Sequence, residues 1–283
     1  MIPRSNLIRA NFLCLLTGVI LLAAGFCPNA HAQGEPAEEP APIVIHPRPL
    51  EYGRDVFLPH LGQGTQASFF KRDALIALAL GGVVTVAVST QDEKIRDYWR
   101  AESPLGDWSE WGDQWGGGSI QPVIVLGMYG WGHYSKNQRL ATNAEVLAEA
   151  LIIQGVVVNV MKPAIGRERP DHSDQQAFPS GHTSNAFAFA AVMDDRYGHK
   201  WGVPLFAAAT FVGLSRMEDN KHWASDVAFG ATLGTVIGYA VSKSHDDYPY
   251  QKTWRRDKKI TLLPILPDAQ SDRTGVMIAW PVN

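Results

Sequence analysis

The chain has 283 residues, and its 46% hydrophobic and 10% aromatic content excludes an intrinsically disordered protein. The formal net charge of −3 provides no overall basic field, so the composition gives no reason to expect a nucleic acid partner. Charged residues make up only 19%, below the ~25% of an average soluble protein, which is typical of chains with large buried or lipid-facing surfaces.

The N-terminal segment 1–32 has the pattern of an export signal. A positively charged start precedes the apolar stretch 11–26, and the Ala-His-Ala sequence at 30–32 offers a cleavage site. The apolar stretch is short for a membrane span, which favours a cleaved signal over a retained anchor. Both cysteines precede the cleavage site, so the cleaved protein would contain neither a thiol nor a disulfide.

The remaining chain divides into a linker, a helical region and a tail. Residues 33–70 form a proline-rich linker and lead-in, and 71–245 are predicted to form a helical domain. In the tail 246–283, two apolar runs flank a polar turn sequence, which predicts a small β-hairpin. Apolar periodicity predicts helices at 71–90, 120–133, 143–162, 181–195, 203–215 and 223–243. The expected fold is all-α, a compact bundle of about six helices with a small C-terminal β-hairpin.

Two compositional features bear on how these helices pack and whether they contact a membrane. Small residues recur in the predicted helices and would let helix backbones approach closely, as in membrane bundles and in tight soluble ones; the glycines concerned are Gly81, Gly82, Gly155, Gly230, Gly234 and Gly238. The polar stretch between the first two helices carries Trp99, Trp108, Trp111 and Trp115. Tryptophan suits a membrane interface, but a packed surface loop or lid is the interpretation that we favour.

The sequence FPSGHTSNAF at 178–187 opens a predicted helix. Pro179 and Ser180 suit a helix start and its cap, and Gly181 allows another group to approach the backbone. The free N–H groups and the helix dipole make such a first turn an anion site. His182 meets the unfavourable end of the dipole when it is charged, and a nearby anion would relieve this. These residues alone are also compatible with an ordinary capped helix.

The loops before and after this helix carry further polar residues. Upstream, the cations Lys162, Arg167 and Arg169 crowd one short loop, where they could bind phosphate oxygens or simply face solvent. Downstream, Arg216 leaves an apolar helix, and His222 and Asp226 follow it. The last two are four residues apart, so we expect one helix turn to stack them, with the carboxylate fixing the tautomer of the imidazole.

These segments together suit phosphoryl transfer through a covalent intermediate on histidine. An exposed ion pair is the alternative for the histidine and carboxylate. Metal binding by the same pair has no support from a further cluster of His and Asp at ligand spacing.

The three segments resemble the type 2 phosphatidic acid phosphatase family, which shares its site with vanadium haloperoxidases and bacterial acid phosphatases. The family pattern is K-x6-R-P, then P-S-G-H, then S-R-x5-H-x3-D. It matches this sequence at every element: Lys162, Arg169-Pro170, Pro179-Ser180-Gly181-His182, Ser215-Arg216, His222 and Asp226. A three-part pattern over about 65 residues is far more specific than any single part.

The resemblance implies a role for each matched position. His222 would be the nucleophile, Asp226 would orient it, and His182 would be the general acid. The phosphate oxygens would be held by Lys162, Arg169, Arg216, Ser180 and Gly181. The resemblance implies no metal and no other cofactor.

The family includes both membrane-spanning lipid phosphatases and soluble exported enzymes. We expect a membrane-associated enzyme, exported to the bacterial cell envelope, with its active site facing the periplasm. Two crossings, by 71–90 and 143–162, would then precede Lys162, and 120–133 would not span.

The expected activity is a metal-independent phosphatase for phosphomonoester or diphosphate groups of envelope lipids. The alternatives are a soluble periplasmic acid phosphatase for small phosphoesters, a vanadium haloperoxidase, and a non-catalytic phospholipid-binding protein. The sequence leaves the head group and the oligomeric state open.

Overall fold

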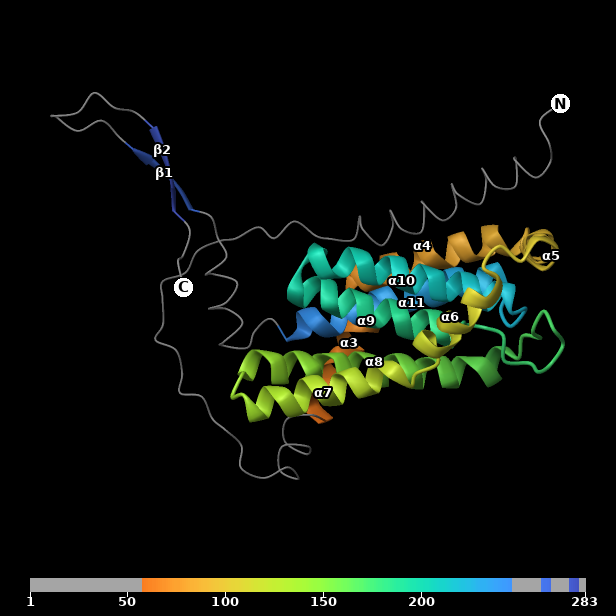
Figure 1. Cartoon of the computed structure of the whole chain (residues 1–283), viewed down its shortest axis with the longest axis horizontal. Helices are drawn as coiled ribbons and strands as arrows, with labels where there is room; N and C mark the ends of the chain where they lie inside the picture. Colours follow the sequence, from red (N-terminus) through yellow and green to blue (C-terminus); the bar gives the residue numbers. More distant parts are fainter. Residues whose placement is uncertain (1–57, 246–260, 266–274, 280–283) are drawn as a thin grey trace. The chain divides into compact units, whose positions relative to one another are not determined.

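The computed structural model describes residues 58–245, 261–265 and 275–279. The first of these ranges folds into nine α-helices and one turn of 3-10 helix (Figure 1). They are α3 (Leu58–Phe70), α4 (Arg72–Ser89), α5 (Asp92–Glu102), η2 (Gly106–Trp108), α6 (Ser109–Gly116), α7 (Ile120–Tyr134), α8 (Gln138–Ile165), α9 (Gly181–Tyr197), α10 (His199–Glu218) and α11 (Ala224–Ser244).

All six predicted helices are confirmed, as α4 and α7 to α11, and the all-α class is confirmed for the described helical region. The count of about six was too low, because α3, α5 and α6 were not predicted. Helix α8 also begins earlier than expected. Asn137 caps the helix, since its Oδ1 accepts the Leu140 N–H at 3.1 Å, and α8 therefore starts at 138, five residues before the predicted start at 143.

The tryptophan-rich stretch was wrongly expected to be a loop, since it forms α5, η2 and α6. In α5, Ile95 and Trp99 are four residues apart and both are buried, while most of the other positions are charged and exposed. Trp108 and Trp111 are exposed, so the stretch has both a packed face and an open one.

Helices α9 and α11 form the centre of the bundle, and glycines on α11 let them pack backbone to backbone. A Cβ at Gly230 would lie 2.6 Å from the Ser180 carbonyl oxygen, and one at Gly238 would lie 2.6 Å from that of Ala188. At Gly234 a Cβ would overlap the Ser184 carbonyl. The predicted role of small residues is therefore confirmed on this face.

The other three glycines of the predicted set, Gly81, Gly82 and Gly155, differ in how closely a neighbouring helix approaches them. A Cβ at Gly81 would overlap Thr232 across the contact between α4 and α11, whereas a Cβ at Gly82 or Gly155 would meet nothing within 4 Å. Close helix approach therefore explains Gly81 but not the other two.

Helices α4, α8 and α11 are each long and apolar enough to cross a membrane. Helix α7 has 15 residues and is shorter than these three. The outward faces of α4, α7 and α8 carry many exposed apolar side chains: Leu75, Ile76, Leu80, Val83, Val86, Val123, Leu126, Trp131, Ile152, Val156 and Val160. These features support membrane association, because apolar surface on this scale is unusual for a protein in water.

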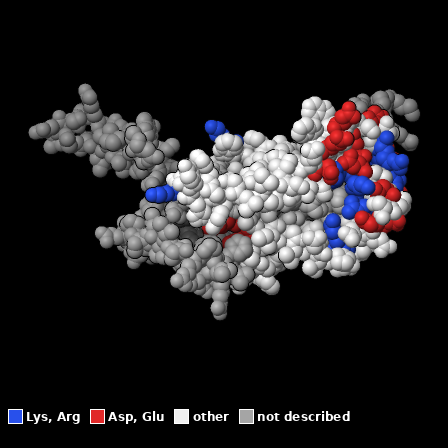
Figure 2. All heavy atoms as spheres, turned by 60° about the horizontal axis from the view of Figure 1, so that its bottom comes forward, with Lys and Arg blue, Asp and Glu red and all other residues white. Residues whose placement is uncertain are grey.

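Charged side chains gather at one end of the bundle on the face shown in Figure 2, and the rest of its helical surface there is largely uncharged. This is the end that carries α5 and the loop after α8 in Figure 1. The matched sequence segments lie at this end.

Strands β1 (Thr261–Ile265) and β2 (Gly275–Ala279) pair antiparallel, with Thr261 opposite Ala279. The segment that would join them lies outside the described residues, so the hairpin stays a prediction. The expected export signal and the linker as far as position 57 lie outside the described residues, whereas the rest of the predicted lead-in, 58–70, forms helix α3.

Candidate active site

Four backbone connections draw the matched segments together. The Ala177 N–H donates to the Arg167 carbonyl at 2.9 Å, and the Ser180 N–H donates to the Asp226 carbonyl at 3.1 Å. The N–H groups of Lys221 and His222 both donate to the Arg216 carbonyl, at 3.1 and 3.2 Å. The loop after α8, the start of α9, the end of α10 and the start of α11 therefore meet at one end of the bundle.

His222 lies at the centre of this junction and is 3% exposed. Its Nδ1 is 2.6 Å from the Ala177 carbonyl oxygen, which can only accept a hydrogen bond. Nδ1 must therefore carry the hydrogen, which leaves the lone pair of the neutral ring on Nε2. A neutral imidazole held in this tautomer can act as a nucleophile through Nε2.

The prediction that Asp226 accepts a hydrogen bond from His222 is wrong, although the two side chains are close. The Asp226 carboxylate lies 3.8 Å from Nδ1, too far for a hydrogen bond. Helix α11 begins only at Ala224, so His222 precedes it and does not stack on the same helical turn. A backbone carbonyl fixes the ring instead, and the buried carboxylate beside it can stabilise a positive charge on the imidazole.

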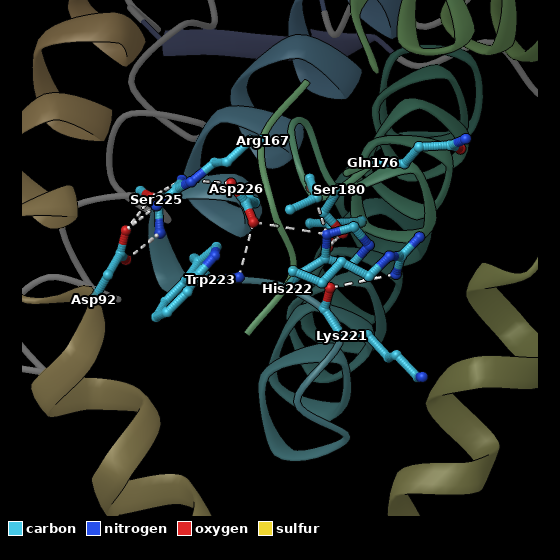
Figure 3. Close-up of polar contacts among 12 residues, drawn as sticks. Asp92, Arg167, Gln176, Ser180, Lys221, His222, Trp223, Ser225 and Asp226 are labelled. Atoms are coloured by element: carbon cyan, nitrogen blue, oxygen red, sulfur yellow. Dashed lines mark hydrogen bonds and ion pairs between the residues drawn. The ribbon is translucent and has the colours of Figure 1, made fainter. Parts of the chain in front are cut away.

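Asp226 is held by Arg167, which the pattern had not included (Figure 3). The Arg167 guanidinium donates to Asp226 Oδ1 at 2.6 Å and to Asp92 Oδ2 at 2.7 Å. Asp92 in turn accepts the backbone N–H of Ser225 at 2.9 Å. This group, Asp92, Arg167, Ser225 and Asp226, forms a buried ion-pair network behind the histidine, so Arg167 does not serve as a free cation for a substrate.

His182 stands in the first turn of α9 and contacts a carboxylate from a distant helix. Its Nε2 lies 3.1 Å from Oδ1 of Asp113 on α6. The same oxygen pairs with the Arg216 guanidinium, which also pairs with Asp219. Asp113 was not anticipated, because its sequence neighbours carry no motif; the glycines at 112 and 116 were the available sign that α6 packs closely.

The remaining predicted cations lie around the same point. Arg169 donates to Asp174 at 2.7 Å and to the Lys221 carbonyl at 3.3 Å. Lys162 is partly buried, and its Nζ lies 3.9 Å from where a Cβ of Gly181 would stand. Its ammonium group has no hydrogen bond or ion pair with the described residues, so it is available to an anion at the start of α9.

The first turn of α9 has the form of an anion site. Its first intrahelical bond runs from the Ser184 N–H to the Ser180 carbonyl, so the N–H groups of Gly181 and His182 precede the ladder. Ser180 does not cap the helix with its side chain; its hydroxyl lies 2.9 Å from the Thr183 hydroxyl.

A cavity of about 370 Å³ opens beside this turn. Lys162, Gly181 and His182 line it next to the start of α9, and α8 supplies an apolar wall together with the amides of Gln154 and Asn159. The cavity can accommodate whatever is attached to an anion bound between these groups.

The environment keeps both histidines neutral. Burial lowers the pKa of His222, and the Asp226 carboxylate opposes this. Burial and the positive charge of Arg216 lower the pKa of His182 to about 4, against the opposing effect of Asp113. A neutral His222 suits nucleophilic attack, whereas His182 needs an added negative charge nearby to hold a proton at neutral pH.

Residues 144–249 match the family model described as the PAP2 superfamily. They form a PAP2 superfamily domain. All eight residues proposed from the resemblance lie inside the PAP2 domain, whereas Asp92 and Asp113 lie outside it.

Curated relatives of the PAP2 domain are named as phosphatases. The chain is 36% identical over 123 residues to a lipid A 1-phosphatase of Porphyromonas gingivalis, covering 42% of this chain and 28% of that protein. It is 30% identical over 166 residues to a probable diacylglycerol pyrophosphate phosphatase of Schizosaccharomyces pombe, covering 42% of this chain and 59% of that protein. The chain thus spans less than two thirds of either relative.

Among solved structures, a transmembrane PAP2 type phosphatidylglycerolphosphate phosphatase of Bacillus subtilis aligns with a TM-score of 0.37 and 18% identity. The alignment covers 82% of this chain and 94% of that one.

Proposed function

We propose that this protein is a metal-independent phosphatase that hydrolyses phosphorylated envelope lipids through a phosphohistidine on His222. The observation that carries the proposal is the buried imidazole whose Nδ1 is committed to the Ala177 carbonyl at 2.6 Å, which reserves Nε2 for attack. The naming of the relatives as lipid phosphatases supports the reaction class.

In the first step, His222 Nε2 attacks phosphorus and forms an N–P bond. The bond from phosphorus to the leaving oxygen breaks, and its electron pair stays on that oxygen, which takes a proton from His182. Lys162, Arg169 and Arg216 balance the charge on the other phosphate oxygens, where this loose transition state needs it. To free its guanidinium for this task, Arg216 would loosen its present ion pairs.

The second step returns the site to its starting state. Neutral His182 takes a proton from water, whose oxygen attacks phosphorus as the N–P bond breaks and its electron pair returns to His222. Inorganic phosphate leaves. The N–H group of Gly181 and the hydroxyl of Ser180 would complete the phosphate cradle during both steps.

A lipid substrate is favoured over a small soluble phosphoester by the exposed apolar faces of α4, α7 and α8. These faces would hold the chain in or at a bilayer, with the charged end that carries the site at the membrane surface. We propose that this end faces the periplasm after export of the chain. The cavity beside Lys162 would receive the part of the lipid next to the phosphate.

The test is phosphate release from purified protein given a panel of envelope lipid phosphates and diphosphates, p-nitrophenyl phosphate and small sugar phosphates, in excess EDTA. We expect turnover of at least one lipid and none by the His222→Ala variant. Preference for the soluble esters would support a broad acid phosphatase, and turnover that needs vanadate and halide would indicate a haloperoxidase. Lipid binding without any turnover would leave only a binding protein and refute the proposal.

A further inference from the structure

Asp113 contacts both His182, the proposed general acid, and Arg216, although it lies outside the PAP2 domain. One carboxylate oxygen, Oδ1, contacts His182 Nε2 at 3.1 Å and the Arg216 guanidinium. A carboxylate accepts hydrogen bonds and does not donate them, so Nε2 must carry a hydrogen. The other ring nitrogen, Nδ1, is then the one that can exchange a proton with a substrate.

Helix α6 holds this carboxylate in place through its glycines. A Cβ at Gly112 would overlap the Ser215 hydroxyl on α10, and one at Gly116 would lie 2.5 Å from Val212 and 2.8 Å from the Cβ of His182. The helix therefore lies directly against His182 and against Ser215, the residue before Arg216. Packing this close fixes the position of the α6 backbone, and with it the starting point of the Asp113 side chain.

We propose that Asp113 is a positioning residue, which holds the His182 ring with Nδ1 toward the leaving oxygen and stabilises its imidazolium form. The inference rests on the proposed function, because it assigns a partner to the general acid of that reaction. In the reaction, His182 would give its Nδ1 proton to the leaving oxygen as the P–O bond breaks. It would then remain neutral, with Nε2–H still on Asp113.

The groups around His182 explain why such a partner is needed. Arg216 faces it from α10, with Asp219 paired to the far side of the guanidinium, and His222 faces it from the loop before α11. Lys162 lines the same cavity from α8. Most of these groups oppose a positive charge on His182, and Asp113 provides a negative charge in direct contact with the ring.

The distinguishing experiment is a pH profile of kcat/KM for Asp113→Asn against the unaltered enzyme. Two substrates are compared: p-nitrophenyl phosphate, whose leaving group needs no acid, and an alkyl phosphate, whose leaving group does. Loss of the carboxylate should move the basic limb for the alkyl phosphate about one unit to lower pH. Above that limb the alkyl phosphate should then turn over about tenfold more slowly, while p-nitrophenyl phosphate changes little.

The matched control is Glu110→Gln, which removes the same charge from an exposed position one turn earlier on α6. It should leave both profiles unchanged. The substrates ionise identically in assays of the unaltered enzyme and of the variants, so a difference between their pH profiles must come from ionisation of the protein. If Asp113→Asn does not fold, Asp113→Ser replaces it, and Asp113→Glu should largely keep the limb in place.

Two results would overturn the inference while leaving the proposed function intact. Equal slowing of both substrates at every pH would reduce Asp113 to a structural role. Faster turnover of both substrates with an unmoved limb would show that the carboxylate instead competes with phosphate for Arg216. The proposed function itself fails separately, if the unaltered enzyme has no activity that depends on His222.

Discussion

Replacing Arg167 by methionine should destabilise the protein far more than a surface substitution does. The guanidinium lies between two buried carboxylates, with 5% of the Asp92 side chain and none of the Asp226 side chain exposed. Methionine keeps an unbranched apolar chain but leaves both carboxylates without their cation.

Removing one partner of a buried ion pair costs about 3–5 kcal/mol. Because the Arg167 side chain is itself 29% exposed, we take the lower end of this range, about 3 kcal/mol. For a domain of this size that corresponds to a fall in Tm of roughly 6–12 °C, measurable by circular dichroism during heating in detergent.

Arg96→Met is a close control. Arg96 and Arg167 both lie over the Trp223 ring, at 5.4 and 5.5 Å, so each variant loses one cation–π contact. The carboxylate partner of Arg96 is largely exposed, and such a surface pair is worth about 0–1 kcal/mol. Adding Asp92→Asn to Arg167→Met should recover part of the lost stability. If Arg167→Met and Arg96→Met lower Tm equally, the buried network does not hold the site together.

Three further predictions concern packing, pH and specificity. Gly234→Ala should cost roughly 1–3 kcal/mol of unfolding free energy in a thermal melt, because its Cβ would overlap a carbonyl on α9, whereas Gly82→Ala should be neutral or stabilising; equal effects would contradict the close helix contact. The free energy of unfolding should fall as pH is lowered from 6.5 toward 4, because His182 and His222 are protonated in the unfolded chain but stay neutral in the folded protein. A constant Tm across this window would contradict the lowered pKa values of both histidines. Gly155→Leu should fill the cavity and raise KM for lipid phosphates more than for p-nitrophenyl phosphate in steady-state kinetics; an equal rise would place the lipid elsewhere.

The long helices were predictable because each is a long, predominantly apolar run, and the identity of the site residues was predictable because they stand at fixed spacings in the sequence. The helices α5 and α6 were missed because few apolar positions hold them, and α6 owes its place to contacts of Gly112 and Gly116 with other helices. Only tertiary structure brings such contacts about.

The partners of the two histidines were missed for related reasons. Asp113 stands 69 residues before His182 and 103 before Arg216, with no local pattern that links them. The group that fixes His222 is a backbone carbonyl, which any residue at position 177 could supply. Spacing predicted a hydrogen bond from His222 to Asp226, but His222 precedes the helix, and the carboxylate stays 3.8 Å from Nδ1, beside the ring but beyond hydrogen-bond distance.

The most direct test of the central claim is to trap the covalent intermediate. The purified protein is mixed with a lipid phosphate that it hydrolyses and stopped in alkali, where a phosphohistidine survives, and its peptides are mapped by mass spectrometry. We predict phosphate on Nε2 of His222, at a level that rises before steady state, and none in His222→Ala. Turnover with no phosphate on His222, or with phosphate on another residue, would contradict the proposed mechanism.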